Sequence, residues 1–485
     1  MDKPSFQWPL VEEFLDREKE RTRIEEWWTS AERMPLNVYG RRRVGKSWLL
    51  RRCAHGKPAV FLVAERLAAG AQLARFAKTL APLQGGVAPE LPDTPTLIQT
   101  LYRMAANEPL LAVIDEFPWL LGTTSSEVER TLSAIQAVME DERDSSRLKL
   151  ILCGSAVAQM EALQSERSPL HGRLVPLEIR PLSLDRAVDF LPDQDPIAQF
   201  ERFAIAGGMP RYLAALRSGS LKEAICQQVL HPDAPLWGEG RTIVAQELRE
   251  PGIHFAVLEA LASGAKEVSE TAAAVRVPST SIPKYLSTLE SLRLVRRELP
   301  IAAAPSARGG HWSLTDAFLR FWFRFVFPFQ ADLEAGLAPE DLYQAEIAPA
   351  LAGHIAPVFE DVCRQHARRT YGAVATRIGR WWGRAEDALR RSGERSSEEI
   401  DIVGMTRNRV TLIGEVKWTN RPLGPKVVHE LERYRLPALR QAGYKVDREP
   451  HIVLYSKAGF SMSLRDRARS DDSLHLVDGV DVLAS

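Results

Sequence analysis

The sequence predicts an α/β protein whose N-terminal part is built on a parallel β-sheet covered by helices. Apolar segments that suit strands alternate with helical segments up to about residue 180, which is typical of a parallel sheet. The run at 110–114 is apolar without interruption and therefore suits a strand buried on both faces. A glycine-containing loop at 40–47 joins a largely apolar strand at 36–39 to a helix.

That loop, at 40–47, is the most informative segment. Its sequence, G-R-R-R-V-G-K-S, satisfies every fixed position of the phosphate-binding pattern G-x-x-x-x-G-K-[ST]. Backbone N–H groups of such a loop point at phosphates, Lys46 reaches the β- and γ-phosphates, and the Ser47 hydroxyl holds Mg²⁺. The strand–loop–helix context favours this interpretation over an ordinary glycine-rich turn. The candidate nucleotide-binding residues are Gly40, Arg41, Arg42, Arg43, Val44, Gly45, Lys46 and Ser47.

Two further strands are expected to complete the nucleotide site. The strand at 110–114 is followed by Asp115 and Glu116. Asp115 would hold Mg²⁺, directly or through water, and Glu116 would polarise the attacking water. A strand that begins at 148 ends beside Ser155, which is either a sensor of the γ-phosphate or part of a turn that terminates the strand.

Composition predicts a cytoplasmic protein of about three domains. Lys and Arg number 63 and Asp and Glu number 63 among 485 residues, so no field of the whole chain attracts nucleic acid or a membrane. The four cysteines are far apart, which disfavours a disulfide framework and a zinc site. The charged N-terminus is not a signal peptide, and the most apolar window, 318–329, is too short to span a bilayer.

Segments after residue 183 are mostly helical, and Pro210 stands where one helix can end and the next begin. The sequence of residues 252–300 predicts three short helices and a hairpin, with the spacing of a winged helix-turn-helix. This segment either contacts the DNA groove through residues 279–285 or packs on the rest of the chain. The third helix offers Lys284 alone, with Arg293 just past its end, and this favours packing.

Two neighbouring segments also allow two interpretations each. The loop at 304–310 is rich in Gly, Pro and Ser and is either the turn of the wing hairpin or a linker. The aromatic run at 318–329 contains Arg320 and Arg324. It either stacks on bases or forms a helical core face with arginines that reach solvent, and the second interpretation is favoured.

The C-terminal part predicts a β-hairpin from strands at 399–405 and 410–417. Asp401 lies opposite Gly414 in a regular hairpin, or opposite Glu415 if the hairpin contains a one-residue bulge. Glu415 and Lys417 share one face of their strand.

These side chains form a candidate second active site. Two carboxylates and a lysine could bind Mg²⁺, generate hydroxide and stabilise a pentacovalent phosphate. Glu360, on a helical stretch at 357–362, would add a third carboxylate. The alternative is a structural salt bridge between the carboxylates and Lys417. Nearby basic residues either contact DNA or form a solvated face; they are the tract at 390–399, Lys426, Arg433 and Arg435.

The N-terminal half resembles the archaeal-type ATPase family of AAA-like P-loop proteins. The resemblance rests on five motifs: F-x-x-R-x-x-E at Phe14, Arg17 and Glu20, the loop at 40–47, I-D-E-F-P-W at 114–119, S-P-L-H-G-R at 168–173 and G-G-M-P-R-Y-L at 207–213. It implies ATP hydrolysis by a RecA-like core with a helical lid and a winged helix. It also implies that Pro210 lies near the adenine and that Arg173 is a γ-phosphate sensor or finger. His171 departs from the aromatic residue expected there.

The tail resembles the companion domain often fused to these ATPases, whose pattern is similar to a PD-(D/E)xK nuclease core. Glu360, Asp401, Glu415 and Lys417 occupy the pattern positions, and residues 378–382 precede the Asp strand. The resemblance implies a restriction-endonuclease-like α/β fold.

The predicted organisation is a RecA/AAA-like P-loop core at 1–180, a helical lid at 181–247, a winged helix at 248–325 and a nuclease-like domain at 326–485. The predicted function is an ATPase that uses ATP and Mg²⁺ and couples nucleotide state to a tail acting on DNA. The alternatives are an ATP-gated switch with an inactive tail and a winged-helix DNA-binding regulator. An arginine finger from a neighbour would require a homo-oligomer.

Overall fold

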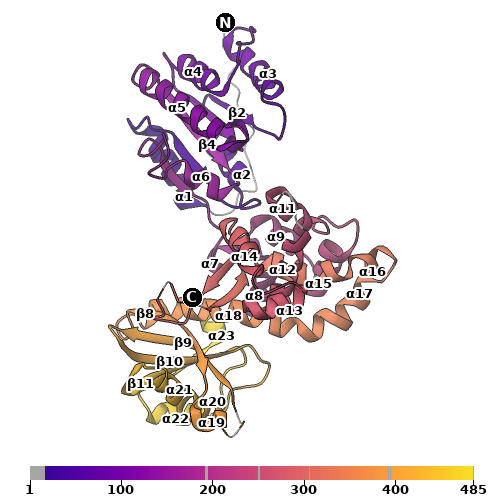
Figure 1. Cartoon of the computed structure of the whole chain (residues 1–485), viewed down its shortest axis with the longest axis vertical. Coiled ribbons are helices and arrows are strands. Elements are labelled where there is room, and N and C mark those ends of the chain that lie inside the picture. The colour runs from indigo at the N-terminus through magenta and orange to yellow at the C-terminus, as the bar shows by residue number, and fades with distance from the viewer. Residues whose placement is uncertain are drawn as a thin grey trace. The chain divides into compact units, whose positions relative to one another are not determined.

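A computed structural model describes residues 17–191, 195–248, 252–304, 306–307, 309–391, 393 and 395–483. The chain divides into two compact units (Figure 1). Unit 1 contains residues up to Leu182 together with Gly208–Arg211, and unit 2 contains Ser183–Gly207 and Tyr212 onward. Phe14 of the predicted lead motif lies outside the described residues.

Unit 1 is built on a five-stranded parallel sheet in the order β2-β3-β4-β1-β5. Its strands are β1 (Leu36–Tyr39), β2 (Ala59–Val63), β3 (Leu110–Asp115), β4 (Leu148–Gly154) and β5 (Val175–Glu178). The first three strands begin where the apolar runs of the sequence begin. The predicted parallel α/β core is therefore confirmed.

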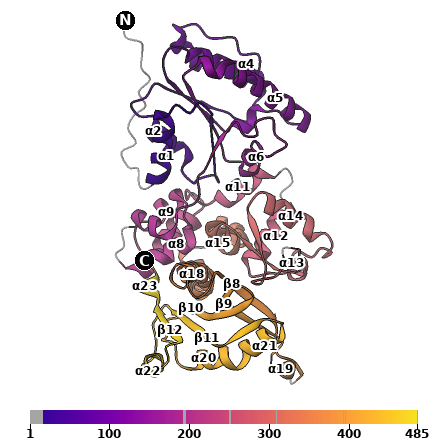
Figure 2. The ribbon, with the colours of Figure 1, turned by 90° about the vertical axis from the view of Figure 1, so that its left-hand side faces the viewer.

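Helices cover both faces of this sheet. They are α1 (Glu18–Thr29), α2 (Lys46–Ala54), α3 (Ala69–Leu80), α4 (Thr94–Met104), α5 (Ser125–Glu142) and α6 (Val157–Ala162). Apolar side chains of α3, α4, α5 and α6 share one core cluster with the strands. Figure 2 shows α1 and α2 on the other side of the strands from α4 and α5. This arrangement places the loop between β1 and α2 at the carboxyl edge of the sheet, where ligands bind in open α/β folds.

The first part of unit 2 is helical. Its main helices are α8 (Pro196–Ala206), α9 (Pro210–Ala215, whose first two residues belong to unit 1), α10 (Leu221–Ile225), α11 (Glu239–Glu247), α12 (Gly252–Ala262), α13 (Val268–Val275), α14 (Ile282–Ser291) and α15 (Ala317–Phe325). Pro210 begins α9, as predicted from the sequence. The antiparallel strands β6 (Val295–Glu298) and β7 (His311–Leu314) follow α14. Three helices and a hairpin thus occur in the predicted order, and their assignment as a winged helix stays a prediction.

The aromatic run at 318–329 is part of a core. Phe318, Phe321, Trp322 and Phe323 are fully buried on α15. Burial lowers the pKa of Arg320 to about 10, and its guanidinium donates to the carbonyl of His354 at 2.6 Å. The core-face interpretation is therefore confirmed, but Arg320 is largely buried and does not reach solvent as predicted. The loop at 304–310, as far as it is described, joins β6 to β7 and is the connection of that hairpin.

The C-terminal part of unit 2 contains a five-stranded mixed sheet in the order β12-β11-β10-β9-β8. Antiparallel β8 (Arg377–Arg384), β9 (Ser397–Thr406) and β10 (Arg409–Lys417) are followed by β11 (Lys445–Ser456) and β12 (Leu474–Asp478), which run parallel to β10.

This mixed sheet is also covered on both faces. The long helix α18 (Ala348–Thr370), α8 and α23 (Gly479–Leu483) pack on one face. The helices α20 (Lys426–Glu430), α21 (Leu436–Gln441) and α22 (Met462–Ser470) pack on the other. Figure 2 shows α18 and α20 on opposite sides of the strands.

The predicted boundary at residue 180 lies beside the division between the units at Leu182. The predicted lid, winged helix and tail fall almost wholly within unit 2, so their separation into three domains stays a prediction. None of the helices in the described ranges is long and apolar enough to cross a membrane.

Candidate functional site

The phosphate loop joins β1 to the N-terminus of α2. A Cβ added to Gly40 would lie 2.1 Å from the carbonyl oxygen of Ile179, the residue that follows β5. Only glycine therefore fits at position 40. Arg43 and Gly45 have φ angles of 71° and 97°, in the left-handed region that glycine adopts without strain. Turns of this kind let successive backbone N–H groups point toward a bound anion.

Lys46 lies within the loop. Its side chain is buried, and Nζ donates to the carbonyls of Gly40 at 2.7 Å and Arg41 at 3.2 Å. These carbonyls hold the ammonium group at the loop, where the phosphates of a nucleotide would compete for it.

The predicted Mg²⁺ ligands of the loop and of β3 are in direct contact. Ser47 Oγ donates to Asp115 Oδ2 at 2.8 Å, and Asp115 Oδ1 accepts the N–H of Glu116 at 3.0 Å. A hydroxyl and a carboxylate at the mouth of a phosphate loop are oxygen donors of the kind that Mg²⁺ prefers. The residues present therefore fit Mg²⁺ at this position.

Glu116 is held by Ser155 at the ends of two neighbouring strands. The Ser155 hydroxyl lies 2.7 Å and 2.9 Å from the two carboxylate oxygens, and the Ser155 N–H donates at 3.1 Å. Glu116 has a φ of 54°, in the left-handed region. The structure thus brings together the predicted water-polarising residue and the predicted sensor.

Arg17 supports the loop from α1, a contact that the sequence prediction did not include among the site residues. Its guanidinium is buried, donates to the carbonyl of Val44 at 2.9 Å and pairs with Glu20 at 3.0 Å. The signal was available, because Arg17 and Glu20 belong to the lead motif.

The other predicted residues differ in their distance from the loop. A Cβ on Gly45 would lie 3.8 Å from Cγ of Pro210, so Pro210 is beside the loop. Arg173 instead pairs with Glu140 on α5 at 2.6 Å. Its role as a γ-phosphate sensor stays a prediction and requires release of that ion pair. Arg42 is exposed.

The C-terminal hairpin adopts the bulged register. Arg409 pairs with Thr406 and Gly414 with Ile402, and the register shifts between Val410 and Leu412. The bulge brings Asp401 to the level of Glu415, the second of the two predicted alternatives. Asp401 Oδ2 accepts the N–H of Val416 at 2.9 Å.

Glu415 is enclosed by cations. One of its oxygens accepts a hydrogen bond from Lys417 and the other from Arg435, which also lies 3.8 Å from Glu398. Burial is the main cause that raises the pKa of Glu415, Asp401 raises it further, and Arg435 and Lys417 oppose the shift. Arg435 was predicted either to contact DNA or to lie on a solvated face, because nothing in the sequence joins it to a residue twenty positions earlier.

Glu360 approaches Asp401 from α18. Burial, and then the charge of Asp401, raise the pKa of Glu360 to about 7. Arg364 lies 3.7 Å from Glu360 and donates to the carbonyl of Asp401 at 3.1 Å. The carboxylate of Glu360 is therefore near Asp401.

Glu360 and Glu415 lie on different sides of the sheet. Glu360 belongs to α18, whereas Glu415 faces Arg435, which lies between α20 and α21 in the chain. Throughout the described part of the chain, no three His, Cys, Asp or Glu side chains are grouped so that they could hold a metal ion. The carboxylates do not converge here, and their assignment as metal ligands stays a prediction.

Comparison with protein families agrees with the geometry of unit 1. Residues 14–216 match the family described as "ATPase domain predominantly from Archaea". The chain carries an archaeal-type ATPase domain. Residues 322–431 match a second family, described as "Archaea bacterial proteins of unknown function". The matched segment of this chain includes Glu360, Asp401, Glu415 and Lys417.

Individual proteins are similar over most of the chain. An uncharacterized protein of Methanocaldococcus jannaschii is 26% identical over 84% of this chain and 87% of its own length. A Walker-type ATPase of Pyrococcus abyssi has a TM-score of 0.50 at 19% identity and covers 65% of this chain and 98% of its own. The ORC2 protein of Aeropyrum pernix has a TM-score of 0.41 at 15% identity over 71% of this chain and 97% of its own. At 19% identity, the Pyrococcus structure supports a shared fold alone.

Proposed function

We propose that the archaeal-type ATPase domain binds ATP with Mg²⁺ in the loop at 40–47 and hydrolyses it through Glu116. The hydrogen bond of 2.8 Å between Ser47 and Asp115 is the observation that carries this proposal. It joins the loop to β3 at the point where a nucleotide-bound cation needs both oxygens. When bound, Mg²⁺ would neutralise charge on the β- and γ-phosphates.

Each residue of the domain has a separate task in this proposal. Lys46 leaves the carbonyls of Gly40 and Arg41 and binds phosphate oxygens, while the loop N–H groups hold the β-phosphate. Glu116 accepts a hydrogen bond from the attacking water and orients it. Ser155 donates its hydroxyl and its N–H to the carboxylate of Glu116, which keeps further acceptor sites for the attacking water.

The test of this site is the rate of ATP hydrolysis in Lys46→Ala. Loss of the ammonium should lower kcat at least about 100-fold, the scale found for a single charge-stabilising group in an active site. Lys78→Ala is the control, because Lys78 is exposed on α3 and equally basic. Wild-type turnover in Lys46→Ala would overturn the assignment.

A second activity is proposed for the tail, namely metal-dependent cleavage of DNA coupled to the nucleotide state. It is supported by the order of helix and mixed sheet from α18 to β11 and by the influence of Asp401 on the pKa of both Glu360 and Glu415. The present side-chain arrangement does not fit a metal, because Glu415 is bound by Lys417 and Arg435. Cleavage would therefore require Arg435 to release Glu415.

This second activity is tested by incubating supercoiled, linear and single-stranded DNA with the protein, ATP and Mg²⁺ or Mn²⁺. Cleavage that disappears in Asp401→Ala and in Lys417→Ala, and persists in Lys445→Ala, a change of an exposed lysine on β11, would support a nuclease. If the wild type leaves every form uncut, the tail is an inactive partner of an ATP-gated switch. The contacts of Glu415 with Lys417 and Arg435 favour that alternative, because they occupy both oxygens of a proposed metal ligand.

A further inference from the structure

A pocket lies between the segment that follows β6 and the start of β8, wholly within unit 2. Its volume is about 610 Å³, and its lining comes from residues 299–303, Arg368, Gly372 and residues 375–379. This volume suits a ligand of mononucleotide size, since small-molecule sites range from about 300 to 1,000 Å³. Neither the predicted nucleotide loop nor the carboxylates of the tail line it.

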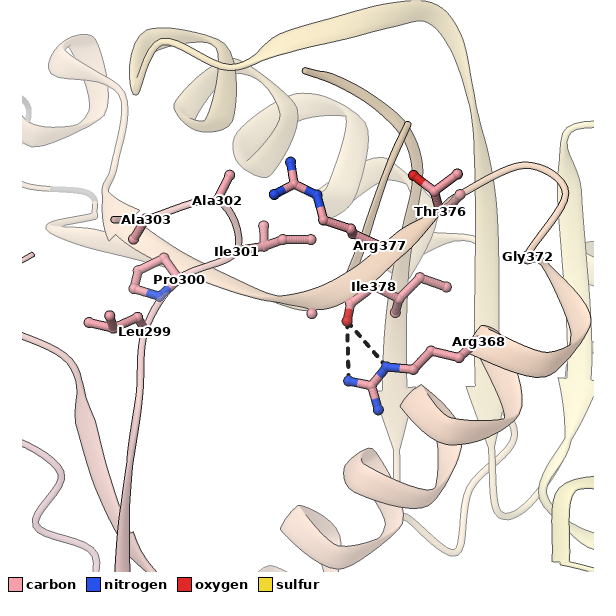
Figure 3. A pocket seen from close by; sticks show the side chains of 12 residues that line it. Leu299, Pro300, Ile301, Ala302, Ala303, Arg368, Gly372, Thr376, Arg377 and Ile378 are labelled. Carbon is pink, nitrogen blue, oxygen red and sulfur yellow. Dashed lines mark hydrogen bonds between the residues drawn. The ribbon is translucent and has the colours of Figure 1, made fainter. Parts of the chain in front are cut away.

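The lining of the pocket combines an apolar part and a cationic part. Leu299, Pro300, Ile301 and the two alanines after them form an apolar wall, whereas Arg368 of α18 and Arg377 of β8 supply guanidinium groups. Figure 3 shows both guanidinium groups extending toward the side lined by Leu299 to Ala303. Such a lining accepts an anionic group against the guanidinium groups and an apolar or aromatic body against the wall beside them.

The positive charge at this site is not compensated by the protein. Arg368 donates to the carbonyl of Ile378 at 3.1 Å and 3.3 Å, and Arg377 donates to the carbonyl of Arg407 at 3.1 Å. The lining contains no Asp or Glu, and neither arginine has a carboxylate partner in the described part of the chain. Each guanidinium also keeps unused N–H donors, because five are available on each.

The apolar wall is held in place and is locally strained. Ile301 donates its N–H to the carbonyl of Arg380 at 2.8 Å, and its own carbonyl accepts the hydroxyl of Tyr444 at 2.6 Å. The next residue, Ala302, has a φ of 64°, a left-handed conformation that costs about 1–2 kcal/mol for a residue other than glycine. Strain of this kind persists where the surrounding structure fixes a ligand site.

We propose that this pocket binds a small phosphorylated molecule of the size of a nucleoside monophosphate. The phosphate lies between Arg368 and Arg377, whose two positive charges match the charge of about −1.5 to −2 on a phosphate monoester. The sugar or base contacts Pro300 and Ile301. A nucleic-acid strand is disfavoured because the wall beside the cations is apolar. This ligand site does not require a nuclease activity in the tail, and it is separate from the ATP-binding site.

The test is calorimetric titration of the full chain, first saturated with ADP and Mg²⁺ so that the phosphate loop is occupied. AMP, UMP, adenosine and inorganic phosphate are the probes. We expect a monophosphate to bind at least about tenfold more tightly than adenosine, and Arg377→Gln to weaken it about tenfold, the scale for a charged hydrogen bond. Arg469→Gln is the control, because Arg469 is an exposed arginine on α22 paired with Asp466 at 3.0 Å.

Arg368→Gln should have the same effect, but Arg368 also supports β8 through Ile378. Arg377→Gln therefore decides the outcome, with its melting temperature checked against the wild type. Absence of monophosphate binding, or equal binding by Arg377→Gln and the wild type, would overturn the proposal. So would a preference for a single-stranded oligonucleotide whose affinity falls steeply with salt, since that behaviour marks a backbone track.

Discussion

Ser155 donates both its hydroxyl, at 2.7 Å, and its backbone N–H, at 3.1 Å, to the carboxylate of Glu116. Ser155 follows β4 and Glu116 follows β3, so these adjacent parallel strands bring the two residues together. The contact connects the residue proposed to orient water with the residue best placed to sense the γ-phosphate. Ser155 uses both of its donors on Glu116, and the carboxylate keeps further acceptor sites for water, because its two oxygens together offer about four.

The first prediction concerns Glu116→Gln. The amide cannot accept a proton and orients water poorly, so kcat for ATP hydrolysis should fall about 100-fold or more. Binding of ATP should persist, because Lys46 and the loop N–H groups are unchanged. The measurement combines phosphate release with equilibrium binding of labelled ATP. Equal loss of binding and hydrolysis would show that Glu116 is structural.

The second prediction separates the two interpretations of Ser155. If Ser155 positions Glu116, Ser155→Ala should lower kcat about tenfold with little change in KM for ATP, because the backbone N–H still contacts the carboxylate. If Ser155 only ends the strand, both constants should match the wild type. Ser165→Ala is the control, since Ser165 is an exposed serine whose hydroxyl donates to a local carbonyl at 2.9 Å.

Most strands of the archaeal-type ATPase domain could be predicted because each is encoded by a local run of apolar residues. The bulge between Val410 and Leu412 could be named as an alternative but not chosen, since the pairing of two strands decides it. The pairing of Arg435 with Glu415 could not be predicted at all. It depends on how the helical segment after β10 returns to the sheet, and no local pattern encodes that path.

The third prediction concerns Arg17, whose buried guanidinium donates to the carbonyl of Val44 in the phosphate loop at 2.9 Å. Arg17→Gln should leave that carbonyl without its partner, which costs about 1–3 kcal/mol, and loosen the loop. The affinity for ATP should fall about tenfold, and the melting temperature of the protein should also fall. Lys19→Gln, an exposed change on the same helix, should leave both unchanged. An unaltered affinity for ATP in Arg17→Gln would show that α1 does not support the loop.

The fourth prediction is a pH dependence of stability that originates at Glu360. Burial beside Asp401 raises the pKa of Glu360 from 4.5 to about 7 in the folded protein. The folded state therefore holds this proton more tightly than the unfolded state, and the stability it contributes is complete below about pH 4.5 and is lost as the pH rises through about 7. Glu360→Gln cannot ionise. In the presence of EDTA it should melt about 3 °C above the wild type at pH 8 and show little difference at pH 5.

The matched control for Glu360→Gln is Glu270→Gln, which should change the melting temperature in the opposite direction. Hydrogen bonds from the backbone N–H groups of Lys266 and Glu267 lower the pKa of Glu270. The ionised form of Glu270 therefore stabilises the fold at every pH above the ordinary pKa of a glutamate. Glu270→Gln should therefore melt below the wild type at pH 8, and the deficit should shrink as the pH falls through the pKa of Glu270 in the folded protein. Differential scanning calorimetry from about pH 3 to about pH 8 measures both variants, since this range includes the ordinary pKa of a glutamate. A pH-independent difference for Glu360→Gln would mean that the carboxyl is not desolvated beside Asp401, and the proposed proximity of the two carboxylates would then be wrong.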